Sequence, residues 1–90
     1  MKIGSIEIKG YAALAPMAGV ADRAMRELCR YYGAAFTVGE LTSSRGVVLN
    51  DKKSAALLTA SDKERPFGSQ LFGNSPEIMA EAARAALHFN

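Results

Sequence analysis

Three parts of this 90-residue sequence contain residues that could bind a flat ligand with a polar edge, namely Pro16-Met17-Ala18, Glu40 and Gln70. Pro16 restricts φ and lacks an N–H group, and Ala18 adds little bulk, so backbone can approach a ligand closely there. Gln70 places a primary amide in an apolar strand, where its N–H₂ and C=O groups need partners. A βα corner without a ligand, and a Gln70 bonded to neighbouring strand backbone, remain open as alternatives.

The predicted elements that must position these residues are alternating strands and helices. Residues 1–10 predict a small hairpin, and Ser75 with Pro76 predicts the start of the last helix. The predicted buried strands are 11–15, 34–38 (ending at Gly39-Glu40) and 67–72, and the predicted helices are 22–32, 43–49, 54–58 and the segment after Ser75. This β-α-β-α-β-α order implies right-handed crossovers and a parallel sheet.

Three parallel strands leave an open apolar edge, and the sequence stops directly after a helix. We therefore expect an α/β fold that is the amino-terminal part of a (β/α)₈ TIM barrel, with roughly the first three βα units preceded by a β-hairpin. The carboxyl ends of the strands would then converge on one face, where such barrels bind ligands.

The helix over 22–32 is predicted to bury one face and expose the other. The expected buried face is Ala21, Met25, Leu28, Cys29 and Tyr32, and the expected exposed residues are Arg23, Glu27 and Arg30. On this face Cys29 is more typical of a small buried hydrophobe than of a nucleophile.

Composition excludes several classes of protein. The net charge of +2 is too small to indicate a nucleic-acid partner by itself, and the one cysteine excludes an internal disulfide. The longest apolar stretch, 11–21, is shorter than the roughly 20 residues of a membrane helix. Neither a metal-ligand cluster nor a P-loop or Rossmann motif is present. We expect a soluble, cytoplasmic protein without a metal.

The run from Ala15 to Asp22 closely resembles the amino-terminal signature of the tRNA-dihydrouridine synthases, which usually have Thr in place of Ala21. The resemblance continues through 23–29, 37–40 and 70–73 and is closest to the bacterial B-type branch. It implies an FMN-dependent oxidoreductase with a TIM barrel and a helical tRNA-binding domain. Such an enzyme uses NADPH, or NADH, to reduce its flavin and converts uridine in tRNA to 5,6-dihydrouridine.

The resemblance also implies roles for individual residues. Pro16, Met17 and Ala18 would line the isoalloxazine ring through their backbone, and Gln70 would hydrogen-bond the pyrimidine edge. Hydride would pass from flavin N5 to C6 of a uracil turned out of its stack. The family's catalytic Cys lies after the fourth strand, beyond Asn90, so no catalytic residue is assigned, and Cys29 does not match that position.

Residues 1–90 are thus expected to be a partial FMN-binding barrel domain, inactive alone, from a monomeric protein whose partner is tRNA. The rest of the barrel and the helical domain would be absent from it. One alternative is a small-molecule flavin oxidoreductase of the dihydropyrimidine or dihydroorotate dehydrogenase type. Another is a truncated product without function.

Overall fold

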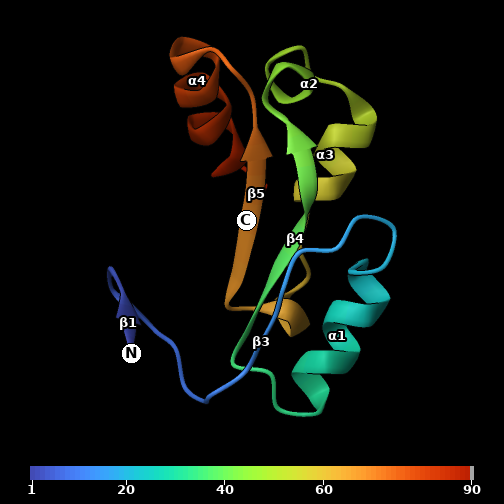
Figure 1. The fold of residues 1–90 in the computed structure, drawn as a ribbon, viewed down its shortest axis with the longest axis vertical. Coiled ribbons are helices and arrows are strands. Elements are labelled where there is room, and N and C mark those ends of the chain that lie inside the picture. The colour runs from blue at the N-terminus through green and yellow to red at the C-terminus, as the bar shows by residue number, and fades with distance from the viewer. Residues whose placement is uncertain (90) are drawn as a thin grey trace.

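A parallel sheet organises the molecule, as the order of elements predicted (Figure 1). A computed structural model describes residues 1–89. Its strands β3 (Ala13–Leu14), β4 (Phe36–Ser43) and β5 (Phe67–Phe72) lie in the order β3-β4-β5, and both pairs are parallel. Strands β1 (Lys2–Ile3) and β2 (Ile6–Glu7) form a separate antiparallel hairpin. The predictions of a parallel sheet and of a leading hairpin are confirmed.

Helices connect the strands. They are α1 (Arg23–Tyr31) between β3 and β4, α2 (Ser44–Val48), α3 (Lys52–Leu58) and the 3₁₀ helix η1 (Asp62–Glu64) between β4 and β5, and α4 (Pro76–Ala86) after β5. Asp22, Ser43, Asp51 and Ser75 cap α1 to α4 by accepting backbone N–H bonds. None of the helices described here is long and apolar enough to cross a membrane.

The hydrophobic core lies between the helices and β5. Figure 1 shows α2 and α4 side by side near the carboxyl ends of β4 and β5, and these two helices are in contact. Buried Val47, Leu58, Ala82 and Ala86 form the core cluster, and Leu71 of β5 packs against it. The helices therefore cover the face of β5 that carries Leu71.

The first predicted strand is shorter and less buried than expected. The sequence predicted a buried strand over 11–15, whereas β3 contains only Ala13 and Leu14, and Tyr11 is fully exposed. Within the described residues β3 has a strand neighbour on one side only, which is β4. An apolar segment is buried only where a second layer covers it, and little covers β3 here.

The prediction that the second strand ends at Gly39-Glu40 is wrong, because β4 continues to Ser43. Val38 pairs with Gly68 and Leu41 with Gln70, so β4 advances three residues while β5 advances two. One extra residue is thus accommodated in a β-bulge at Gly39-Glu40.

Gly39 lets the Phe67 ring of β5 pack closely against β4, and it does not end the strand. A Cβ at Gly39 would lie 2.7 Å from Cζ of the Phe67 ring, so only glycine admits that ring at its present position.

Helix α1 buries polar groups that its apolar pattern did not reveal. Leu28 and Tyr32, expected to be buried, are exposed. Arg30, expected to be exposed, is half-buried, and its Nη1 donates to the carbonyl oxygens of Ala34 and Ala35 at the turn into β4. Arg30 thus connects the last turn of α1 to the segment that leads into β4.

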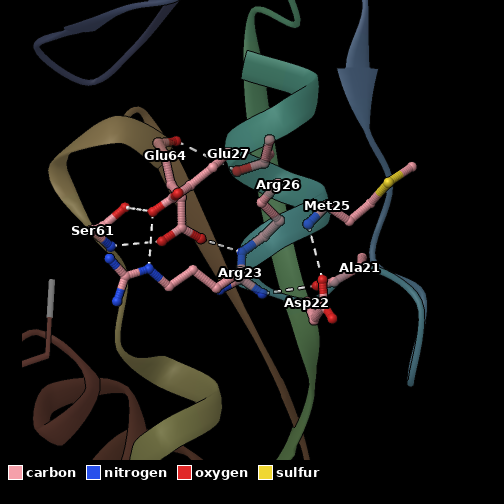
Figure 2. Close-up of polar contacts among 9 residues, drawn as sticks. Ala21, Asp22, Arg23, Met25, Arg26, Glu27, Ser61 and Glu64 are labelled. Carbon is pink, nitrogen blue, oxygen red and sulfur yellow. Dashed lines mark hydrogen bonds and ion pairs between the residues drawn. The ribbon is translucent and has the colours of Figure 1, made fainter. Parts of the chain in front are cut away.

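Arg26 and Glu64 form a buried ion pair, with 3% and 0% of their surfaces exposed (Figure 2). Arg26 Nε donates to Glu64 Oε1, and Arg26 Nη1 donates to the carbonyl oxygen of Ala21 at 2.8 Å. The guanidinium also lies over the Phe67 ring, 5.0 Å from its centroid. The pair thus connects the start of α1 to η1 and to β5.

A second, more exposed set of bonds surrounds this pair (Figure 2). Glu64 Oε2 accepts from the Ser61 N–H at 2.6 Å. Glu27 Oε1 accepts from Arg23 Nε at 2.9 Å and from Ser61 Oγ at 2.7 Å. These bonds, that from Arg23 first, lower the pKa of Glu27 below its ordinary value. Helix α1 and η1 are therefore joined by a continuous polar network.

Replacing Arg26 with methionine should lower the free energy of unfolding by about 3–5 kcal/mol, because Glu64 would remain buried without its counter-charge. Urea unfolding measures this change. Arg23→Met is the matched control on the same helix, since Arg23 pairs with Glu27 at the surface and should shift the midpoint little. Equal shifts for the two variants would contradict the dependence on the buried pair.

Substituting Gly39 with alanine should cost about 1–3 kcal/mol, because the added methyl group overlaps the Phe67 ring. Gly68→Ala is the control, since a Cβ there would meet Val38 Cγ2 at an ordinary 3.5 Å. Neither glycine has a positive φ, so the comparison isolates crowding from backbone strain. Similar melting temperatures for both variants would argue against the close approach of Phe67.

Candidate functional site

The loop between β3 and α1, residues 15–22, is held in a compact turn. Gly19 has φ of +75°, and the N–H groups of Val20 and Ala21 both donate to the Met17 carbonyl oxygen, at 3.0 and 2.7 Å. A Cβ at Gly19 would meet nothing within 4 Å, so the positive φ, rather than crowding, favours glycine here. Asp22 then caps α1 by accepting from the Met25 N–H at 2.9 Å.

Glu40 contacts this loop directly. Its Oε1 accepts a hydrogen bond from the Gly19 N–H at 2.5 Å, across 21 residues of sequence. The sequence predicted that Glu40 and the loop would meet at strand ends. The structure brings them together, but Glu40 reaches the loop from the bulge in the middle of β4.

Gln70 lies on the face of β5 that points away from the helices. Phe67 contacts Arg26 of α1 and Leu71 packs on the core, so strand alternation places Gln70 and Phe72 on the opposite face. Gln70 is half-buried and is the register partner of Leu41. Its side-chain amide makes no hydrogen bond to any residue from 1 to 89, so the alternative of a bond to neighbouring strand backbone is not observed.

The N–H groups of Met17 and Ala18 have no partner in the described part of the chain, and neither do those of Ala15 and Asp22 at the two ends of the loop. Met17 and Ala18 are both exposed, whereas the N–H groups of residues 19–21 are all used inside the protein. Adjacent free donors on a tight loop can bind acceptor atoms of a ligand that lies against the backbone.

Cys29 is half-buried in α1 and lines a shallow groove with Leu14 and Tyr32. It lies two helical turns from the start of α1, where the loop ends. This position agrees with its interpretation as a packing residue.

Sequence reasoning missed Arg26 and Glu64, which hold the carboxyl end of the loop through Ala21. They are 38 residues apart, and each reads in isolation as an ordinary surface charge. No local pattern distinguishes such a buried pair.

Comparison with known proteins gives the family. Residues 13–89 match the family described as dihydrouridine synthase (Dus). The chain is 44% identical over 84 residues to tRNA-dihydrouridine synthase B of Shewanella oneidensis and 39% identical to that of Vibrio vulnificus. It is 33% identical to the probable tRNA-dihydrouridine synthase of Treponema pallidum.

These alignments each cover 93% of this chain, which spans about a quarter of the length of these curated relatives (26%, 26% and 25%). Because the family match extends over most of the sequence, the chain belongs to the dihydrouridine synthase family.

Proposed function

We propose that this chain supplies part of the flavin site of a tRNA-dihydrouridine synthase, which uses FMN and NADPH or NADH to reduce uridine in tRNA to 5,6-dihydrouridine. The observation that carries the proposal is the set of unpaired donors and acceptors formed by the N–H groups of Met17 and Ala18 and the amide of Gln70. The names of the relatives support tRNA as the substrate. We place the proposed reaction in the cytoplasm.

The residues present fit a flavin. A flavin has a flat ring with a polar pyrimidine edge, and bound FMN would supply the hydride that reduces the uracil ring. Pro16, Met17 and Ala18 offer their backbone to the ring, and Ala18 adds little side-chain bulk beside it. The Gln70 amide can both donate to and accept from the ring edge. These residues would bind and orient the flavin, and none of them is proposed as the proton donor.

We infer that the three parallel strands form one wall of a (β/α)₈ barrel, with residues 1–90 as part of its FMN-binding domain. The strand order β3-β4-β5 follows the chain order, as in the successive βα units of such a barrel. Gln70 and Phe72 lie on the face of β5 opposite the helices, which corresponds to the barrel interior. This arrangement supports a ligand site at the carboxyl ends of the strands.

Gln70→Leu should weaken FMN binding about ten-fold or more, because an apolar side chain of similar size loses the hydrogen bonds to the ring edge. Quenching of flavin fluorescence in the full-length polypeptide measures the dissociation constant. The urea midpoint should be nearly unchanged, since the amide has no partner among residues 1–89. An unaltered FMN affinity would remove Gln70 from the proposed site.

A hybrid enzyme tests the proposed reaction. The 84 matching residues of the Shewanella oneidensis relative are replaced by those of this chain and expressed in a bacterium lacking its own dihydrouridine synthases. Mass spectrometry of tRNA nucleosides should then detect dihydrouridine. The chain of 90 residues alone should restore none, because it provides only part of the proposed barrel.

A folded hybrid that leaves tRNA unmodified would contradict the proposal. Reduction of free pyrimidines by that hybrid would instead favour a small-molecule flavin oxidoreductase.

A further inference from the structure

The bulge in β4 changes the direction in which Glu40 points. In a regular strand Glu40, two residues after Val38, would share the face of Val38 and Gln70. Because of the extra residue, Leu41 occupies that face instead and pairs with Gln70. Glu40 lines a hollow of about 460 Å³ with residues of α1 and α3 and reaches Gly19 of the loop. Bulges commonly redirect a side chain next to an active site.

The bond from Glu40 adds to the hydrogen bonds that hold residues 19–21 of the loop. The N–H groups of Val20 and Ala21 donate to Met17, and the Ala21 carbonyl oxygen accepts from Arg26. The N–H of Gly19, the residue just before them, donates to the Glu40 carboxylate at 2.5 Å. A carboxylate acceptor makes a stronger bond than a neutral one.

We propose that Glu40 is a positioning residue for the flavin. It holds Gly19 at positive φ, and thereby keeps the N–H groups of Met17 and Ala18 turned outward to the ligand. Glu40 acts through the backbone and does not need to touch the flavin. This inference rests on the proposed function, because it assigns a ligand to the loop that Glu40 holds.

The test uses the polypeptide at the length its organism makes, with Glu40→Ala, Glu40→Gln and, as the matched control, Glu81→Ala. Glu81 is an exposed carboxylate on α4. FMN affinity is measured by fluorescence quenching. Hydrogen exchange and the NMR shift of the Gly19 amide report the loop without any flavin.

Glu40→Ala should weaken FMN binding about ten-fold to hundred-fold and speed exchange of the Gly19 amide. Glu40→Gln retains an acceptor oxygen, so its FMN affinity and its Gly19 amide exchange should lie between those of Glu40→Ala and the unsubstituted protein. Glu81→Ala should change neither the FMN affinity nor the exchange of the Gly19 amide. The urea midpoint shows whether a weaker FMN affinity comes from a displaced loop or from an unfolded protein. If Glu40→Ala does not fold, Glu40→Gln provides the comparison.

Two results would overturn the inference. One is a Glu40→Ala variant whose Gly19 amide and FMN affinity are unchanged. If the unsubstituted protein still forms dihydrouridine, that result leaves the proposed function intact. The other is an unsubstituted protein that binds no FMN. That result would overturn both proposals even if substitution of Glu40 changes the exchange of the Gly19 amide.

Discussion

The burial of the charges on Arg26 and Glu64 is the constraint on which the rest of this structure depends. Moving two charges out of water costs several kcal/mol each, so both groups must be fully bonded. Arg26 therefore needs Glu64 and the Ala21 carbonyl, and Glu64 also needs the Ser61 N–H. Satisfying the pair places the start of α1 against η1. The same guanidinium also bonds the Ala21 carbonyl oxygen, near the end of the loop before α1.

A second carboxylate holds the same loop from the other side. Glu40 extends from a bulge in β4 to the Gly19 N–H, while Arg26 holds the Ala21 carbonyl oxygen. Both ends of the three-residue span from Gly19 to Ala21 are thus bonded to side chains from outside the loop. The conformation of the loop therefore depends on these two bonds from the sheet and the helix as well as on its own bonds to the Met17 carbonyl oxygen.

Much of the fold could be predicted from local chemistry. The caps at Asp22 and Ser75, and the alternation of apolar and capped segments, correctly predicted a parallel α/β arrangement. The extent of individual elements could not be predicted as well. Gly39 reads as the end of a strand, yet it lies within β4 because the Phe67 ring occupies the space of a Cβ. That contact joins residues 28 positions apart and has no local signature.

The sequence by itself determined the alternation of strands and helices, the starts of α1 and α4 and the family signature in the run from Ala15 to Asp22, because these depend on residue type and short-range spacing. It also named Pro16, Met17, Ala18 and Gln70 as candidate ligand contacts. Only the tertiary structure decided that Arg26 is buried, that Glu40 faces the loop and that the Met17 and Ala18 N–H groups are left without partners. The reason is physical. Burial and hydrogen bonding depend on which residues pack together in the folded chain, and those residues come from distant positions in the sequence.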